Sequence, residues 1–359
     1  MNVAFLLLDA GVGGGQRVAA SVAELLIARG DSVGLLVPGP GPAVERFRSF
    51  GAEVRYVDLV TLRRPYGMAR AVRIVRGYDL LYSHTSIPGQ ILASVAARLA
   101  CCSHVAHQHT YPGFSSRPLI SKAQSLLYRV LLSRTRFIAV AKHVQQGLIA
   151  RGMPPEHVDV IANGVSIPEE MDADAGQPHS LRVGMLGRFD PGKGMHTFIA
   201  AARSAQRGRP MTYVIGGHPG PFRDHENRIR EEARGAGVEI VDATESGLDF
   251  LRSLDVVIVP SRYEGSPLVL LEAMALGKAI IAADISGIRE IIEHDDSGLL
   301  FPPDDADSLE DAILTLSADP VARARLGKGA RYRVVKQYPL ARSLDRIVYT
   351  LEKAVNGDG

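Results

Sequence analysis

The segment VVIVPSRYEGSPLVLLEAMALGKAIIAA, residues 256–283, decides the fold because it indicates a strand, a helix and a second strand in succession. The first apolar run ends at Pro260, and the second closes the segment. Between them, Ser266 and Pro267 predict the N-cap and the first residue of a helix, and Gly277 predicts its C-terminal cap. Parallel strands joined by a helix are the repeating unit of α/β domains.

Two carboxylates stand in this segment. Glu264 falls in the loop before the helix, and Glu272 falls in the middle of an almost wholly apolar helix, where a carboxylate needs a partner. The backbone N–H groups of Gly265, Ser266 and Leu268 at the helix start favour an anion such as phosphate. Hydroxyl binding by the two acids is one interpretation; an exposed loop acid and a helix acid paired with an arginine is the other.

The alternation of apolar strands and helical periods continues along nearly the whole chain. Between the halves, residues 166–180 are rich in proline, glycine and acids and predict a linker. The fold class is therefore α/β, with two Rossmann-like domains facing each other across a cleft, residues 1–165 and 181–340, and with a C-terminal helix, 341–359, that packs back on the first domain. The strands are expected at 3–8, 32–37, 54–57, 80–83, 104–107, 136–140, 158–162, 181–186, 211–215, 238–241, 256–259 and 279–283.

Length and composition agree with two globular domains. The 359 residues exceed the ~250–300 at which single cores usually split. No run approaches ~20 apolar residues, so no membrane-spanning helix is expected. The N-terminus lacks the basic leader of a signal peptide, and the two cysteines, Cys101 and Cys102, are adjacent, which disfavours a disulfide framework and a metal site. We therefore expect a cytoplasmic protein.

Positive charge is concentrated in the first half, where residues 1–160 hold 18 Lys and Arg against 9 Asp and Glu. Residues 118–133 carry apolar side chains at a helical period beside Lys122 and Arg129. Such a helix suits peripheral contact with an anionic membrane at the inner face, although the core face of an ordinary helix is the commoner explanation. A second basic surface is expected from Arg63, Arg64, Arg70, Arg73 and Arg76.

A glycine-rich loop, DAGVGGGQR at residues 9–17, follows the first expected strand. Gly13, Gly14 and Gly15 would let the backbone approach an anion or a substrate closely, or would simply allow tight packing. The dinucleotide fingerprint fails at Gln16, and no Gly-Lys-Ser/Thr follows, so NAD binding and a P-loop are both disfavoured.

A second loop, GRFDPGKG at residues 187–194, follows the first strand of the second domain. Its turn residues bring Arg188 and Lys193 to one side, where a guanidinium and an ammonium could neutralise a pyrophosphate. Exposed surface cations are the alternative.

Taken in order, the glycine-rich first loop, the G-R-x-x-x-x-K-G loop and the motif E-G-x-P-L-x-x-L-E-A-M-A-x-G closely resemble retaining glycosyltransferases of family 4, which have the GT-B fold. The resemblance continues through Ser286, Gly287 and Ile288 and through residues 297–313. It covers nearly the whole chain and is closest over residues 181–315.

The resemblance implies a role for each matching residue. Arg188 and Lys193 would grip the diphosphate of a sugar nucleotide and stabilise the leaving group. Glu272 would hold the ribose hydroxyls, and Glu264 those of the donor sugar. The expected catalytic set is Arg188, Lys193, Glu264 and His109, and the donor-binding set is Gly14, Gly15, Gly187, Gly265, Ser266, Pro267, Leu268 and Glu272.

Three histidines of the first domain are candidates. His109 sits where the family places a histidine near the donor sugar, and His107, two positions earlier, competes for that role; the pair could instead be structural. His84 and Gly13 are assigned to the acceptor side, and for His84 a satisfied core histidine is equally compatible.

No carboxylate is identified that could attack the anomeric carbon. The resemblance therefore implies retention by front-face displacement, with the departing phosphate taking the acceptor proton. The D-x-D pairs at Asp172–Asp174 and Asp305–Asp307 lie in the expected linker and before an expected helix, so no metal and no cofactor is expected.

The substrates implied are a nucleotide-sugar donor, with UDP favoured over GDP, and a small-molecule, lipid or saccharide acceptor; nucleic acid is not expected. Residues 242–248, where relatives contact the base, name no particular base. A GT-B sugar-nucleotide epimerase, a non-catalytic nucleotide-sugar-binding subunit and a membrane-surface module remain alternatives to a hexosyltransferase.

Overall fold

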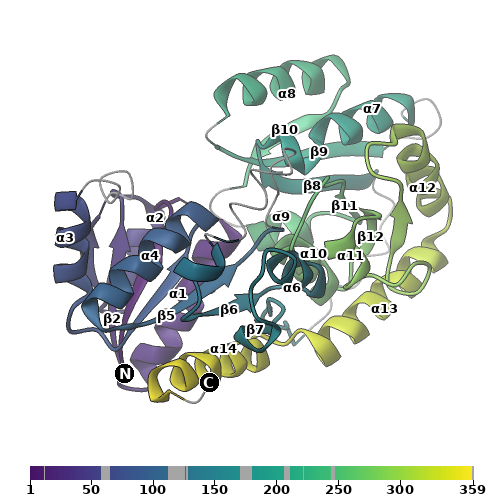
Figure 1. Cartoon of the computed structure of the whole chain (residues 1–359). Coiled ribbons are helices and arrows are strands. Elements are labelled where there is room, and N and C mark those ends of the chain that lie inside the picture. The colour runs from purple at the N-terminus through teal and green to yellow at the C-terminus, as the bar shows by residue number, and fades with distance from the viewer. Residues whose placement is uncertain are drawn as a thin grey trace. The chain divides into compact units, whose positions relative to one another are not determined.

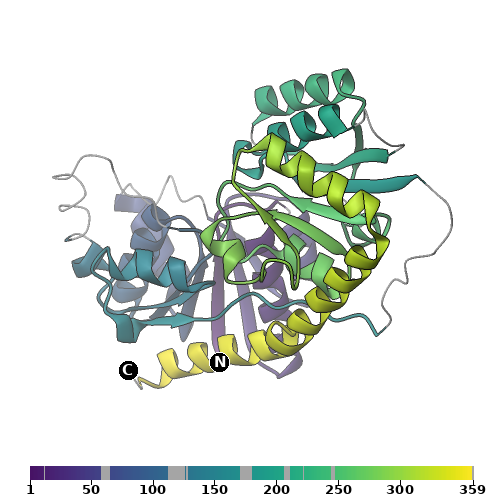
Figure 2. The same cartoon turned by 90° about the vertical axis from the view of Figure 1, so that its right-hand side faces the viewer.

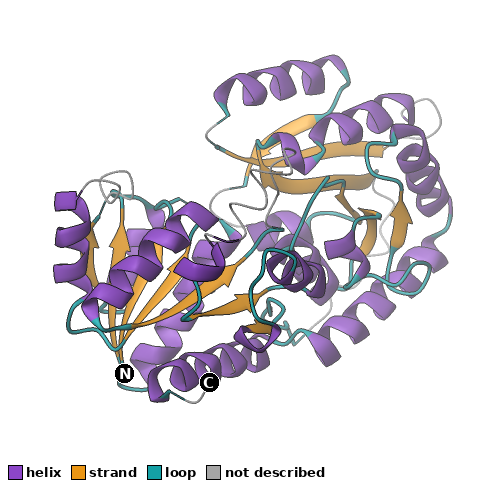
Figure 3. Cartoon of the chain, viewed as in Figure 1, coloured by secondary structure: helices purple, strands orange, loops and turns teal. Residues whose placement is uncertain are grey.

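The computed structural model describes residues 1–11, 13–57, 65–111, 126, 128–169, 180–205, 211–220, 222–243 and 247–357. It divides into two compact units, residues 1–163 with 341–359, and residues 164–340. Each unit contains one parallel sheet with helices packed against it (Figures 1 and 3). The prediction of two Rossmann-like α/β domains is confirmed.

The sheet of the first unit has seven parallel strands in the order β3-β2-β1-β4-β5-β6-β7. Successive strands step outward from β1 to β3, and the chain then returns to place β4 on the other side of β1, so the order reverses between β1 and β4. Ligands of open α/β sheets bind at such a switch point, beyond the carboxyl ends of the strands. The strands are β1 (Asn2–Leu7), β2 (Ser32–Val37), β3 (Glu53–Tyr56), β4 (Leu80–His84), β5 (Ser103–Gln108), β6 (Thr135–Ala139) and β7 (Val158–Val160).

Helices cover both faces of this sheet because alternate side chains of each strand point to opposite faces. On one face, Ala4 and Leu6 of β1 pack with Val75 of α3 and Ala93 of α4. On the other face, the Phe5 ring meets the ring of Phe47 in α2 edge-on at 5.5 Å. The helices are α1 (Gly14–Ala28), α2 (Pro42–Ser49), α3 (Pro65–Val75), α4 (Ile87–Ala100) and α6 (Lys142–Ile149), with the 3-10 turn η2 (Pro155–His157).

The sheet of the second unit has six parallel strands in the order β10-β9-β8-β11-β12-β13, and its switch point lies between β8 and β11. The strands are β8 (Leu181–Arg188), β9 (Met211–His218), β10 (Glu239–Asp242), β11 (Val256–Val259), β12 (Ala279–Ala283) and β13 (Leu299–Phe301). The helices are η3 (Pro191–Lys193), α7 (Met195–Ala205), α8 (Arg223–Gly235), α9 (Gly247–Arg252), α10 (Leu268–Ala275), α11 (Ser286–Arg289), α12 (Ala306–Ala318) and α13 (Pro320–Gln337). The strands predicted from the sequence do not include β13.

The C-terminal helix α14 (Leu340–Asn356) belongs, from Ala341 onward, to the first unit. The Ser343 hydroxyl donates to the carbonyl of Ala162, and the Ser103 hydroxyl donates to the carbonyl of Ala354, both at 2.8 Å. Figure 2 shows this helix, in yellow, beside the N-terminal end of the chain.

The deciding helix begins one residue later than the sequence predicts. Pro267 has an extended ψ of 118° and occupies the N-cap, so α10 starts at Leu268 and Ser266 stands outside it. The predicted end is confirmed: Gly277 has φ +71° and donates to the carbonyl of Met274, while Lys278 donates to the carbonyl of Ala273. That bond pair is a Schellman cap.

The apolar stripe at 118–133 is only partly described. Leu126 and Val130 are 64% and 56% exposed, so the prediction that the stripe is a core face is wrong for these two side chains. Residues 118–125 and Leu127 lie outside the described residues, as do Arg63, Arg64 and most of the expected linker, 170–179. Arg70, Arg73 and Arg76 are exposed on and just after α3. In the described ranges, no helix is long and apolar enough to cross a membrane.

Candidate functional site

The predicted site residues lie around the carboxyl ends of strands at or next to the two switch points. Gly13, Gly14 and Gly15 follow β1, and His84 and His109 come at the ends of β4 and β5. In the second unit, Gly187 and Arg188 close β8, Lys193 closes η3, and Glu264, Gly265, Ser266 and Pro267 fill the loop between β11 and α10, ahead of Leu268 and Glu272. Each set is described within its own unit.

The loop after β8 is locked against the loop after β11. The Asp190 carboxylate accepts from the backbone N–H of Gly192 at 2.8 Å, and the Arg262 N–H donates to the Gly192 carbonyl at 2.9 Å. Gly194 has φ +69°, and a Cβ there would lie 1.9 Å from the Pro260 carbonyl oxygen. No side chain fits at that approach, so this glycine fixes where the preceding lysine is presented.

Lys193 and Glu264 are joined directly. The ammonium Nζ of Lys193 donates to Oε1 of Glu264 at 2.7 Å, and both side chains are largely buried. The sequence assigned these residues to different parts of a ligand and did not foresee the bond between them. The alternative that Glu264 is a solvent-exposed loop acid is wrong, since the carboxylate is paired and mostly shielded.

Arg188 lies beside the same loop but is held more loosely. Its guanidinium Nη2 is 3.9 Å from the Asp190 carboxylate, and its side chain is 40% exposed. A guanidinium at this distance keeps most of its donors for another acceptor. Arg188 therefore has donors for an incoming anion. The Lys193 ammonium has three N–H groups, so it can also bind an anion while it stays near Glu264.

Glu272 is buried within α10, with 4% of its surface exposed. Its neighbours Leu270, Leu271 and Ala273 are fully buried. A carboxylate in such surroundings is costly unless polar groups meet it, so Glu272 serves binding or architecture and not solubility.

The start of α11 supports the Glu264 loop, which the sequence did not predict. A Cβ at Gly287 would lie 2.2 Å from the Glu264 carbonyl oxygen and 2.8 Å from that of Gly265. The two backbones therefore touch, and Gly287 is required for the contact. The glycine stands in the family motif, which is the only signal the sequence offers.

The glycine-rich loop of the first unit is shaped by two polar side chains that the sequence analysis missed. The Asp9 carboxylate accepts from the Gly11 N–H at 2.8 Å and from the Gln16 amide at 2.9 Å. The Gln16 amide oxygen would lie 2.5 Å from a Cβ at Gly13. Gly13 therefore leaves room for the Gln16 side chain. The position of Asp9 just after the first strand is the sequence feature that could have indicated this supporting role.

Gly15 brings the first turn of α1 against His109. A Cβ at Gly15 would lie 3.1 Å from Cδ2 and 3.3 Å from Nε2 of the His109 imidazole. The first backbone N–H groups of a helix have no acceptor within the helix, and their dipole favours negative charge. The glycine thus places the His109 ring beside the open start of α1.

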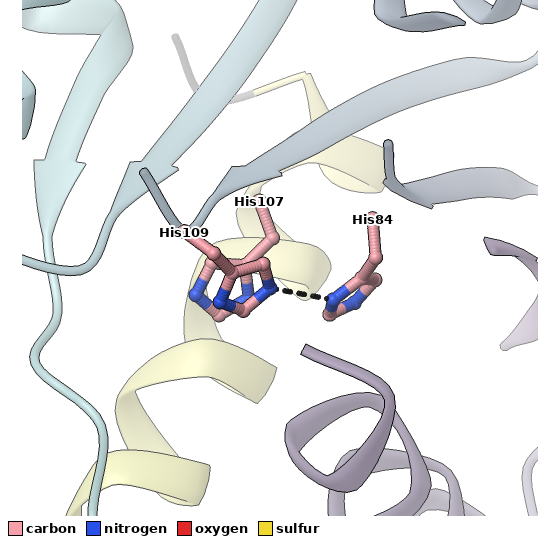
Figure 4. A group of neighbouring side chains, drawn as sticks. All are labelled: His84, His107 and His109. Carbon is pink, nitrogen blue, oxygen red and sulfur yellow. Dashed lines mark hydrogen bonds between the residues drawn. The ribbon is translucent and has the colours of Figure 1, made fainter. Parts of the chain in front are cut away.

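Three histidines form one cluster at the ends of β4 and β5 (Figure 4). A hydrogen bond of 2.9 Å joins His84 Nδ1 to His109 Nε2, and one of 2.6 Å joins His107 Nδ1 to the Tyr82 hydroxyl. The rings of His107 and His109 are stacked at 4.3 Å. Figure 4 shows His84 facing the stacked pair across the bond to His109.

Burial keeps this cluster neutral. It holds the pKa of His84 and of His107 well below the usual value, and it lowers the pKa of His109 to about 4. Neighbouring imidazoles add to the effect on His84 and His107. At neutral pH none of the three carries charge.

His107 and His109 differ in access. His107 is fully buried with its Nδ1 bonded to Tyr82, whereas His109 is only partly buried. The difference supports His109 over His107 as the residue that meets a ligand. His104, by contrast, bonds to the Ser83 and Thr135 hydroxyls at 2.9 Å each and is a satisfied core histidine.

Within the described ranges, His84, His107 and His109 are the one group placed to hold a metal ion, with ligand atoms within 4.8 Å of one another. An ion lies near the plane of each imidazole that binds it, but the stacked planes of His107 and His109 are only 21° apart and share no nearby point. The orientation therefore fits hydrogen bonding better than coordination. Asp305 caps α12 by accepting from the Ser308 N–H at 3.0 Å, and Asp172 and Asp174 lie outside the described residues.

Both units match models of known protein families. Residues 12–168 match the model of Glycosyltransferase Family 4, and residues 167–333 match that of glycosyl transferases group 1. The two models meet near the division between the units and together span most of the chain. The chain is a GT-B glycosyltransferase of the family 4 kind.

Individual relatives of this glycosyltransferase cover much of its length. It is 29% identical to the D-inositol 3-phosphate glycosyltransferase of Kribbella flavida over 76% of this chain and 71% of that protein. It is 24% identical to the UDP-Gal:alpha-D-GlcNAc-diphosphoundecaprenol alpha-1,3-galactosyltransferase of Escherichia coli over 97% of this chain and 95% of that protein. The crystal structure of Anabaena HepE with UDP matches at a TM-score of 0.82 and 23% identity, covering 98% and 100% of the two chains, which shows the common fold.

Proposed function

We propose that this glycosyltransferase moves a hexose-type sugar from a UDP-sugar to a hydroxyl acceptor, with retention of anomeric configuration and without a metal. The observation that carries the proposal is the Lys193–Glu264 pair at the switch point of the second sheet, 2.7 Å apart. A cation and a carboxylate presented side by side there suit a ligand that offers an anionic phosphate and neutral hydroxyls in adjacent positions.

Each side chain of the second unit then has one task. Lys193 and Arg188 bind the diphosphate, Glu264 accepts from hydroxyls of the sugar, and buried Glu272 accepts from the ribose hydroxyls. On binding, the Lys193 ammonium donates to the diphosphate, and the Glu264 carboxylate accepts from the sugar hydroxyls. Backbone groups from Gly265 to Leu268, at the start of α10, complete the contacts to phosphate and sugar.

In the first unit, His109 contacts the donor sugar as a neutral hydrogen-bonding group, and the start of α1 at Gly14 and Gly15 lies beside it. We assign His84 and Gly13 to the acceptor side. A neutral imidazole suits a sugar hydroxyl, because it can donate or accept without adding charge.

The reaction needs no protein nucleophile. The bond between the anomeric carbon and the phosphate oxygen breaks, and its electron pair stays on the departing diphosphate. The acceptor oxygen bonds to the anomeric carbon on the same face, and its proton passes to that phosphate oxygen. Lys193, Arg188 and the start of α10 meet the negative charge as it develops, and electrostatic stabilisation of this kind is usually the largest catalytic contribution.

The relatives support the donor and the acceptor class. The name of the Escherichia coli relative includes UDP-Gal, and HepE was crystallised with UDP. The acceptors named for the relatives are a phosphorylated inositol and a lipid-linked diphosphate sugar. We propose a UDP-sugar and a small-molecule, lipid-linked or saccharide acceptor, in the cytoplasm or at the inner membrane face.

Thermal shift with UDP, GDP, ADP and dTDP tests the donor assignment. At one common concentration of the four nucleotides, UDP should give the largest shift; a hundredfold excess over the dissociation constant corresponds to a stabilisation of about 2.7 kcal/mol. The anomeric configuration of the transferred sugar, read by NMR on the product, tests retention, and activity that survives a chelator tests metal independence. No shift with any nucleoside diphosphate would contradict the proposal.

A further inference from the structure

The bond between His84 and His109 joins two residues that the family motifs leave separate. We propose that His84 is a positioning residue: it donates from Nδ1 to Nε2 of His109 and so holds that ring in one orientation and one tautomer, with the Nδ1 N–H of His109 directed to the donor sugar. This inference rests on the role proposed for His109.

The count of protons supports this direction of the bond. A neutral imidazole carries one N–H, so a bond between two neutral imidazoles holds one proton between them. Nε2 of His84 is buried and has no partner among the described residues. Buried N–H groups without an acceptor are the rarest orphans in proteins, so the proton of His84 belongs on Nδ1, which has a partner. His109 then accepts at Nε2 and carries its own proton on Nδ1.

The bond also fixes which way the His109 ring faces. Stacking on His107 restrains the ring plane, and Gly15 restrains its edge at 3.1 Å. A half-turn of the imidazole about its Cβ–Cγ bond would keep both contacts but would put the carbon Cε1 in place of Nε2. Of these three contacts with described residues, the bond to His84 is the one that distinguishes the two orientations.

The neighbouring groups preserve this arrangement. The Tyr82 hydroxyl is bonded to His107 and its ring packs edge-on against His84 at 4.4 Å. Burial keeps the pKa of His84 well below its usual value, and that of His109 near 4, so the single-proton bond persists at neutral pH.

Nitrogen NMR of the full chain, labelled with ¹⁵N-histidine, reads the tautomer without any substrate. Signals of His109 are assigned by their loss in His109→Leu. In the wild type, two-bond correlations should show a protonated Nδ1 and an unprotonated Nε2 in His109. A protonated Nε2 would overturn the proposal.

Two variants of nearly equal size sharpen this test. His84→Asn keeps a donor at the position of Nδ1, whereas His84→Leu removes it. The His109 tautomer should persist in His84→Asn and should change or become mixed in His84→Leu. An unchanged His109 spectrum in a folded His84→Leu protein would also overturn the proposal.

Kinetics separates this inference from the proposed function. Loss of one neutral hydrogen bond predicts that kcat/KM falls about three- to tenfold in His84→Leu. In His84→Asn, most of this loss should be recovered. If His109→Leu lowers activity while the two His84 variants act alike, the positioning role fails and the role of His109 stands. If His109→Leu has no effect, the proposed function of His109 fails, and the spectra still decide the tautomer.

His104→Leu supplies a control for the loss of a buried imidazole from the same sheet. It removes two hydrogen bonds that do not involve His109. It should lower thermal stability but leave the His109 tautomer unchanged. A change of that tautomer in His104→Leu would show that general loosening of the sheet, and not the bond to His84, sets the His109 signal.

Discussion

The second unit presents charged groups at its switch point, whereas the first presents neutral ones. Lys193 and Glu264 form a largely buried ion pair, while His84 and His109 share one proton in a buried cluster. The first arrangement suits a ligand part that gains negative charge, and the second suits hydroxyls that must be oriented. In the proposed function, the cations that stabilise the leaving group belong to the second unit, and the neutral histidine that contacts the sugar belongs to the first.

The two pairs also respond differently to a ligand. The Lys193 ammonium has three N–H groups and can turn from Glu264 to a phosphate, so we expect the Lys193–Glu264 ion pair to be exchangeable. His109 keeps its bond to His84 and offers its other nitrogen. The following predictions, from the largest effect to the smallest, would break or sharpen this contrast.

Lys193→Met should lower turnover about a hundred- to a thousandfold, because the departing diphosphate loses its nearest cation. The measurement is steady-state turnover with a UDP-sugar. Lys328→Met, at an exposed position on α13, is the matched control and should retain activity. Near-wild-type turnover of Lys193→Met would contradict the role of Lys193 in stabilising the leaving group.

Gly194→Ala should destabilise the second unit by about 2–5 kcal/mol, since alanine is strained at a left-handed φ and its Cβ would clash with the Pro260 carbonyl oxygen. Gly30→Ala has a similar φ of +87° but no atom within 4 Å, so it should lose only about 1–2 kcal/mol. Thermal unfolding of both variants checks the difference. Equal losses would show that the close approach at Gly194 is not required.

Glu264→Gln should lower turnover roughly tenfold to a hundredfold by weakening a charge-assisted hydrogen bond to the sugar. It should leave the affinity for UDP equal or higher, because Lys193 no longer has a competing carboxylate. Activity assays and calorimetric titration of UDP measure the two effects. A parallel loss of UDP affinity would contradict the exchangeable pair.

Lowering the pH should destabilise the first unit at a higher pH than the second. The pKa values of His84, His104, His107 and His109 are lowered by burial, to about 3 for His104 and about 4 for His109, from about 6.5 when unfolded. The unfolded chain then binds more protons than the folded one, so stability falls as pH drops from about 6.5 towards 4. Hydrogen exchange at pH 7 and pH 5 should show greater loss of protection in β4 and β5 than in β8 and β11.

The sequence predicts the fold well, because the fold depends on local patterns. Glu264 and Lys193 stand in motifs with fixed spacing, and most expected strands fall within a few residues of the observed ones. Their pairing was not predictable, since it depends on β8 lying beside β11, which are separated in the chain by β9 and β10.

The same limit explains the histidines. His84 and His109 were each singled out but were assigned to opposite substrates, because 25 residues separate them and only the pairing of β4 with β5 brings them together. Asp9, Gln16 and Gly287 were missed as supporting residues because a support role depends on which backbone or side chain lies opposite, and a motif does not specify that.

Calorimetric titration of UDP into the wild type and into Lys193→Met, in one buffer, tests the central claim most directly. The claim is that the Lys193–Glu264 pair marks the diphosphate site. It predicts saturable binding to the wild type and an affinity at least about tenfold lower in the variant, the loss of one charge-assisted bond. Equal affinities for UDP, or no binding to the wild type, would contradict it.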